Sequence, residues 1–166
     1  MRTPESARQP RGRTAAKLVL RVLTAAALAV DAVVHARLAP GYQAAAAEGI
    51  GEGNLFLAEA AAAALAGLYV LIRGSKPAWV VALFTAGGGL AALLLYRYVD
   101  IPAFGPFPAM YEPVWFFEKT LTALAQAAAV LLAATALALP RRQTSQGDPA
   151  ADTSNEPKSP PPGDPE

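Results

Sequence analysis

The sequence predicts an all-α fold, a polytopic membrane four-helix bundle. Hydrophobic residues make up 54% of the 166-residue chain, and they are gathered into four blocks. Each block approaches the roughly 20 residues that a helix needs to cross a bilayer. The predicted spans cover residues 17–38, 55–72, 78–98 and 114–139. Residues 1–13 and 140–166 are polar and proline-containing, and are predicted to be disordered tails.

The first block, residues 17–38, carries Arg21 and Asp31 within its apolar run. A basic start, a short apolar core and the small residues of Val34–Ala36 also fit a cleaved signal peptide, so this alternative stays open. Arg21 interrupts the apolar core, which favours a membrane span over a signal peptide.

The other three blocks are less interrupted. The second, LFLAEAAAAALAGLYVLI, contains one acid, Glu59. The third, AWVVALFTAGGGLAALLLY, has no charged residue, and the fourth has none after Lys119. These three segments therefore predict transmembrane helices directly.

The basic residues predict how the chain is threaded. If there are four spans, the strongest clusters of lysine and arginine all lie on one side of the membrane, and such loops stay cytoplasmic. We therefore expect a multi-pass protein of the cytoplasmic (inner) membrane with both termini in the cytoplasm. The residues of these clusters are Arg2, Arg8, Arg11, Arg13, Lys17, Arg73, Lys76, Arg141 and Arg142.

Composition excludes several classes of function. The formal net charge is only +1, which argues against a nucleic-acid-binding protein. The chain has no cysteine, which excludes disulfides, cysteine-ligated iron–sulfur clusters and thiolate zinc sites. The chain also has no Ser-His-Asp order and no glycine-rich phosphate loop, so a non-enzymatic protein is favoured.

Polar residues within the spans are predicted to meet at one depth. Asp31 and His35, the only histidine, are four residues apart and share a helix face. Glu118, Thr122 and Gln126 form a similar stripe on the fourth span. Because charges facing lipid are costly, we expect a shared internal site near the outer face for ligand binding or proton handling. Its predicted members are Asp31, His35, Glu59, Arg97 and Glu118.

Three interpretations of this site stay open. His35, Asp31, Glu59 and Glu118 offer an imidazole and three carboxylates, a set suited to a divalent metal. The histidine could instead move protons or bind a quinone-like headgroup, whereas a haem would need a second axial ligand. The third interpretation is that the acids only pair with basic residues and hold the helices together. Those basic residues would be Arg37, Arg97 and Lys119.

Two further features predict packing. Gly87 with Ala91, and Gly88 with Ala92, have the small-xxx-small spacing that lets membrane helices approach closely, within the bundle, with a partner protein or in a homo-oligomer. The connection at residues 100–113 is rich in proline and aromatic residues, and is predicted to be an ordered cap at the membrane interface.

The sequence resembles the small, uncharacterised four-span integral membrane proteins of actinobacteria. The resembling stretches are DAVVHARLAP, GNLFLAEAAAAALAGLYVL and LLLYRY, within residues 17–139. A more distant likeness is to DoxX-like four-helix membrane proteins, some of which are linked to redox or quinone systems. The resemblance implies the fold and the membrane location, and no catalytic residues.

The sequence therefore predicts a small integral membrane protein with a ligand- or metal-binding polar cluster. The alternatives are an accessory subunit of a membrane complex and a quinone- or haem-linked oxidoreductase subunit.

Overall fold

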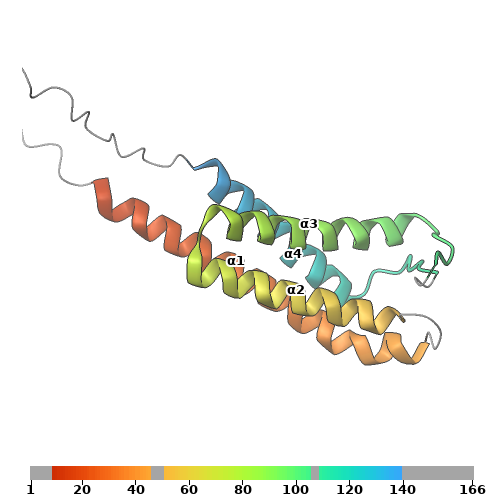
Figure 1. Cartoon of the computed structure of the whole chain (residues 1–166). Helices are drawn as coiled ribbons and strands as arrows, with labels where there is room; N and C mark the ends of the chain where they lie inside the picture. The colour runs from red at the N-terminus through yellow and green to blue at the C-terminus, as the bar shows by residue number, and fades with distance from the viewer. Residues whose placement is uncertain (1–8, 46–50, 106–108, 140–166) are drawn as a thin grey trace, which may run out of the picture.

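The computed structural model describes residues 9–45, 51–105 and 109–139, and it forms four helices packed together (Figure 1). They are α1 (Gln9–Ala45), α2 (Glu52–Arg73), α3 (Lys76–Tyr98) and α4 (Phe117–Ala138). All four are long and apolar enough to span a membrane. The all-α four-helix prediction is confirmed, and the protein is a multi-pass membrane protein with four candidate spans.

The helix ends define two ends of the bundle (Figure 1). At the proximal end, α1 begins, α2 passes into α3, and α4 ends. At the distal end, α1 passes towards α2 and α3 towards α4.

Helix α1 is longer at both ends than the sequence predicts. It begins at Gln9, inside the stretch predicted to be a tail, and continues through Pro40 to Ala45. At 1.5 Å per residue its 37 residues measure roughly 55 Å, well beyond the roughly 30 Å of a bilayer core. Part of α1 must therefore extend past the hydrocarbon layer. The remainder of the predicted tails, residues 1–8 and 140–166, lies outside the described residues.

Small residues bring the helices together. On α3, Ala78, Ala82 and Ala86 recur every four residues and are fully buried, and alanines at positions 125, 129 and 133 of α4 repeat this spacing. On α2, a Cβ at Gly67 would lie 3.3 Å from Leu28 Cβ of α1. Such residues permit the close backbone approach that holds membrane helices together, where lipid provides no hydrophobic driving force.

Large apolar side chains lie on the outside instead. Leu65, Phe84 and Leu131 are each about two-thirds exposed or more, at 66%, 75% and 68%. A water-soluble bundle would have the opposite distribution. The exposed apolar surface therefore fits contact with lipid.

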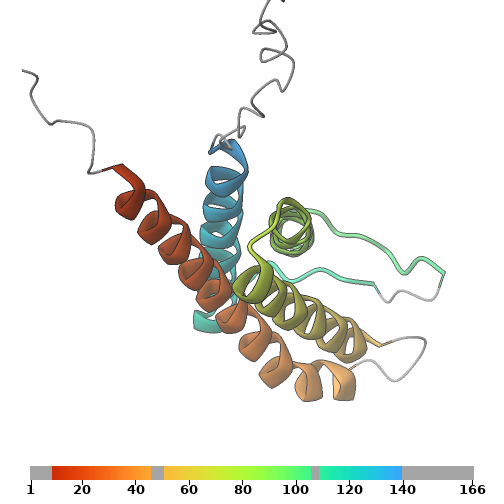
Figure 2. The same cartoon turned by 60° about the vertical axis from the view of Figure 1, so that its left-hand side comes forward.

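The helices are not packed evenly around the bundle. Helix α1 lies along α2 and also contacts α4, whereas α3 packs on α4 and α2 and meets α1 at few positions. In Figure 2, α3 is seen nearly along its axis while the other helices are seen obliquely or from the side, so α3 is tilted relative to them. This arrangement places α1 against both α2 and α4, and polar contacts join it to each of them.

A tight turn links α2 to α3. Gly74 ends α2 in the left-handed conformation (φ 53°), and its N–H donates to Val70 O at 2.9 Å. Pro77 occupies the first turn of α3, where its missing N–H costs no hydrogen bond. Trp79 Nε1 donates to Gly74 O at 3.2 Å and closes the turn.

Arg21 caps the end of α2. Its Nε donates to Val70 O at 3.1 Å, and one terminal nitrogen donates to Leu71 O and Ile72 O at 2.8 and 2.6 Å. The last carbonyls of a helix have no partner within the helix, and they carry the negative end of its dipole. Arg21, which interrupts the first apolar block, therefore joins α1 to α2.

We expect Arg21→Ala to destabilise the bundle by about 1–2 kcal/mol, because it leaves three backbone carbonyls without their charged donor. Arg73→Ala is the matched control, since Arg73 is an exposed arginine at the same end. Thermal unfolding in detergent, followed by circular dichroism, measures both. Equal shifts for the two variants would show that Arg21 acts only as a surface charge.

Candidate functional site

Three polar side chains meet inside the bundle. Asp31 of α1 and Gln126 of α4 are both fully buried, and Gln126 Nε2 donates to Asp31 Oδ1 at 3.0 Å. His35 Nδ1 lies 3.0 Å from the same oxygen. The predicted sharing of one face by Asp31 and His35 is confirmed. Asp31, His35 and Gln126 form the polar cluster of the bundle.

Asp31 determines which way the imidazole faces. His35 Nδ1 contacts both the carboxylate and the backbone oxygen of Asp31, each at 3.0 Å. A carboxylate at this distance keeps a proton on Nδ1, so Nε2 is the ring nitrogen that Asp31 leaves without a contact. Within the described residues, Nε2 has no hydrogen-bond partner. The ring also packs against Phe56, with centroids 5.2 Å apart.

A cavity of about 470 Å³ lies beside His35 at the distal end. This volume is within the range of small-molecule sites, and such sites combine an apolar lining with a few polar groups. Exposed lining residues such as Ala92 and Tyr111 show that the cavity reaches the surface. Its polar lining residues are His35, Tyr42, Glu52, Glu59, Tyr96, Tyr111, Glu112, Lys119 and Thr122.

Gly89 provides the space for the base of the cavity. A Cβ at Gly89 would collide with Gln126 Nε2 and lie 2.6 Å from Glu59 Oε1. The side chains of Glu59 and Gln126 therefore converge on the bare backbone of α3. Glu59 and Gly89 line the cavity, and Glu59 Oε1 is buried without a partner among the described residues.

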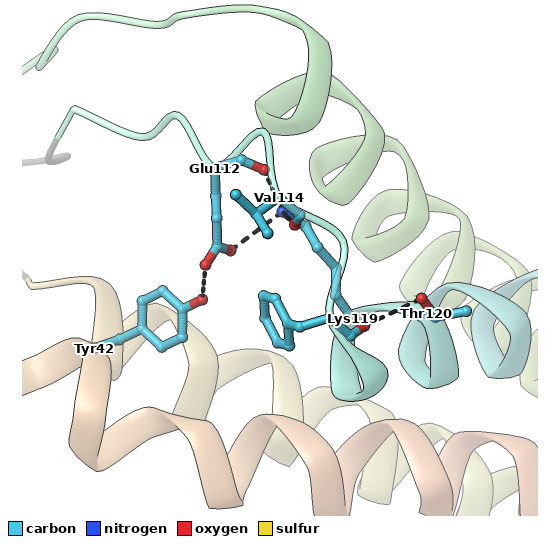
Figure 3. A network of polar contacts seen from close by, with 6 residues as sticks. Tyr42, Glu112, Val114, Lys119 and Thr120 are labelled. Carbon is cyan, nitrogen blue, oxygen red and sulfur yellow. Dashed lines mark hydrogen bonds and ion pairs between the residues drawn. The ribbon is translucent and has the colours of Figure 1, made fainter.

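The rim of the cavity is held by Glu112, which lies in the connection between α3 and α4 (Figure 3). Tyr42 donates to Glu112 Oε1 at 2.6 Å, and Lys119 Nζ lies 3.2 Å from Oε2. Lys119 also donates to the backbone oxygens of Glu112 and Val114, and Glu112 N donates to Tyr96 O at 3.1 Å. Glu112 therefore ties α1, α3 and α4 together at the distal end.

The predicted interfacial cap is partly described. Met110 N donates to Ile101 O at 3.2 Å, so the two arms of the connection are paired. Residues 106–108, which include Phe107, lie outside the described residues. Helix α4 begins at Phe117, three residues after its predicted start, because the residues just before it are extended and their carbonyls are bound by Lys119.

Glu118 does not join the site as predicted. Its side chain is exposed, whereas Thr122 and Gln126 of the same stripe are buried. A four-residue step rotates about 40° around a helix with 3.6 residues per turn, so two steps place Glu118 about 80° from Gln126. Lys119, seven residues before Gln126, lies on nearly the same face and is buried.

Arg97 is placed beside aromatic rings instead of acids. Its guanidinium lies 5.0 Å from the ring centre of Tyr98 and 5.9 Å from that of Trp115. Arg97 does not line the cavity, although Tyr96, the residue before it on α3, does.

The predicted acid–base pairing is absent from the part of the chain that the structure describes. The ion pairs there join His35 to Asp31 and Lys119 to Glu112, and they involve neither Arg37 nor Arg97. Arg37 is exposed. Asp31 is held by an imidazole and an amide, not by an arginine or a lysine.

The metal set predicted from the sequence is not assembled. Over residues 9–45, 51–105 and 109–139, no group of three or more histidine and acidic side chains could hold a metal ion. The exposure of Glu118 is one reason, since it leaves three of the four predicted ligands facing inwards. The geometry that remains is a hydrogen-bonded acid–imidazole–amide cluster beside an open cavity.

Sequence reasoning missed three parts of this site: Tyr42, Glu112 and Gly89. The sequence suggests close packing at Gly87 and Gly88. The structure shows that Gly89 is the glycine against which side chains of α2 and α4 pack. Comparison with known proteins found no matching family model, curated protein or solved structure.

Proposed function

We propose that this protein binds a small amphipathic molecule in the distal cavity and has no catalytic role. Glu59 and His35 would contact its polar end, and apolar residues such as Leu55 and Leu93 would contact its tail. The observation that carries the proposal is a cavity of ligand size with a partnerless carboxylate oxygen at its base. Buried polar atoms are ordinarily paired, so such an oxygen favours a ligand that donates a hydrogen bond.

The polar cluster would prepare His35 for this contact. Asp31 fixes Nδ1, and Gln126 fixes Asp31, so the imidazole cannot turn freely. A group held in this way loses little side-chain entropy when a ligand binds. The same arrangement leaves Nε2 available to a ligand in the cavity.

The charge distribution supports a cytoplasmic proximal end. Arg73 and Lys76 lie in the described connection at this end, beside Lys17 near the start of α1. Loops rich in lysine and arginine remain cytoplasmic, which would place the cavity near the outer face of the cytoplasmic membrane.

A single-cysteine experiment tests this orientation, because the chain has no cysteine of its own. Ala103→Cys, at an exposed distal position, should react with a membrane-impermeant maleimide in intact cells. Ser75→Cys, at the proximal turn, should react only after the cells are permeabilised. The reverse pattern would place the cavity on the cytoplasmic side.

Binding of tritiated dodecylamine to the protein in lipid nanodiscs tests the proposed function. We expect saturable binding of one molecule per cavity, and loss of that binding in Leu93→Trp, which fills the cavity. Leu95→Trp is the matched control, since Leu95 is an exposed leucine of the same helix that does not line the cavity. Binding that is unsaturable, or that survives Leu93→Trp unchanged, would overturn the proposal.

A further inference from the structure

We infer that the ligand of the distal cavity is an organic cation, a protonated amine that carries an apolar chain. This inference rests on the proposed function and names the chemical class of the molecule. It is drawn from three features of the cavity: hydrogen-bond acceptors without donors, an excess of carboxylates, and aromatic walls.

The base of the cavity has acceptors that no donor satisfies. Glu59 Oε1, which lines the cavity, is buried and has no hydrogen-bond partner among the described residues. Gln126 Oε1 and Asp31 Oδ2 are also buried without a partner in that part of the chain, although neither residue lines the cavity. Thr122 Oγ1 is in the same condition, and Thr122 is only 3% exposed and lines the cavity. Gly89 brings Glu59 and Gln126 together here.

A protonated primary amine fits this set because it presents three N–H donors and no acceptor. A ligand rich in acceptors, such as a carboxylate or a quinone, would add oxygens to a region that already has too many. The Thr122 hydroxyl can rotate to accept from an ammonium group, and Glu59 as a carboxylate can only accept.

The charges of the lining point the same way. Three carboxylates line the cavity, those of Glu52, Glu59 and Glu112, against one lysine. That lysine, Lys119, already pairs with Glu112. Glu59 and Glu52 form no ion pair in the described part of the chain, and His35, the basic residue near Glu59, already contacts Asp31, so a cation is the ligand that their charge favours.

Aromatic residues complete a site of this kind. Tyr42 and Phe56 are stacked, with ring centres 4.4 Å apart, and both line the cavity together with Tyr96 and Phe116. Aromatic faces attract organic ammonium groups, most strongly where water is excluded. Leu38, Leu55 and Leu93 provide apolar surface for the chain that the amine carries.

Competition against tritiated dodecylamine tests the inference in the nanodisc assay. Unlabelled dodecylamine is protonated at pH 7 and should compete at least ten times better than dodecanol, which has the same tail and no charge. Glu59→Gln should weaken dodecylamine binding at least tenfold and leave dodecanol binding unchanged. Glu118→Gln is the matched control, because Glu118 is exposed and does not line the cavity.

The outcomes separate this inference from the proposed function. Competition by dodecanol as strong as that by dodecylamine, with Leu93→Trp still abolishing binding, would overturn the inference that the ligand is a cation. That result would leave the proposed function standing. Loss of all saturable binding would overturn both. If Glu59→Gln does not fold, Thr122→Val replaces it, and it should weaken binding of dodecylamine more than that of dodecanol. Equal weakening would again count against the cation.

The ammonium group could belong to a free amine or to the headgroup of a lipid. Lysophosphatidylethanolamine and lysophosphatidylglycerol distinguish these sources, since only the first carries an ammonium. Displacement of dodecylamine by the ethanolamine lipid alone would support a lipid source, and displacement by neither would support a free amine. Displacement by both alike would contradict recognition of the cation.

Discussion

Replacing Asp31 with alanine should lower the stability of the bundle much more than replacing it with asparagine. Asp31 is fully buried and accepts from Gln126 Nε2, and its carboxylate lies 3.0 Å from His35 Nδ1. Alanine removes both side-chain contacts: it leaves the Gln126 amide of α4 without its acceptor, whereas His35 keeps only the backbone oxygen of residue 31 within α1. A hydrogen bond between membrane helices contributes about 0.6 kcal/mol on average and up to roughly 1.7 kcal/mol. Leaving the buried amide of Gln126 without its acceptor adds its desolvation cost, so we expect a loss of about 1–3 kcal/mol in total.

Asparagine has nearly the same shape and keeps one acceptor oxygen, so Asp31→Asn should retain most of the stability. Thermal unfolding in detergent measures both variants. A double-mutant cycle with Gln126→Ala gives the coupling between α1 and α4, which should exceed about 0.5 kcal/mol for residues in direct contact. Equal losses for alanine and asparagine, or no coupling to Gln126, would show that the polar cluster does not join the helices.

The second large effect is expected for Gly89→Ala, which should lower the stability of the protein. Gly88→Ala, one residue earlier, should not lower it. Alanine is favoured over glycine within a helix by up to about 1 kcal/mol, so Gly88→Ala should leave stability unchanged or raise it. Nothing lies within 4 Å of a Cβ at Gly88. At Gly89 the same Cβ would collide with Gln126 and press against Glu59. The atoms that it meets both end flexible side chains, but Gln126 is fully buried and donates to Asp31 from the same nitrogen, Nε2. Moving it costs that hydrogen bond to a carboxylate, about 1–3 kcal/mol, which should outweigh the gain in helix propensity.

Gly89→Ala should also weaken binding in the cavity, because it displaces the two side chains at its base. Gly88→Ala should not affect binding. Unfolding temperatures and dodecylamine binding, measured on both variants, test this difference. Equal stabilisation by both substitutions would contradict the packing of the Glu59 and Gln126 side chains against Gly89.

The sequence predicts the fold well because four apolar blocks of sufficient length leave few alternatives in a bilayer. It predicts helix ends less well. Helix α1 continues through Pro40 to Ala45, although proline and the loss of apolar residues both predict an earlier end. Hydropathy measures where lipid begins, not where backbone hydrogen bonding stops.

The site is predictable only where helix geometry alone decides it. The spacing of Asp31 and His35 determines their shared face, and the structure confirms this. The choice between Glu118 and Lys119 as the inward residue of α4 depends on how α4 is rotated against its neighbours. That rotation is decided by alanine packing along the whole helix, which the polar residues do not reveal.

Contacts between residues far apart in the chain could not be predicted from the sequence. Tyr42 and Glu112 are 70 residues apart and meet only because α1 and the connection before α4 both end beside the cavity. No local pattern indicates this contact. The same holds for Gly89, where two other helices supply the reason for the missing side chain.

Photo-crosslinking tests most directly whether the distal cavity is a ligand site. Dodecylamine with a diazirine near the end of its tail would be irradiated with the protein in lipid nanodiscs, and the adducts mapped by mass spectrometry. We predict adducts on the apolar lining of the cavity, Leu38, Leu55, Phe56 and Leu93, that excess dodecylamine suppresses. Adducts confined to outward-facing residues such as Leu65, Phe84 and Leu131, and insensitive to competitor, would contradict a binding site in this cavity.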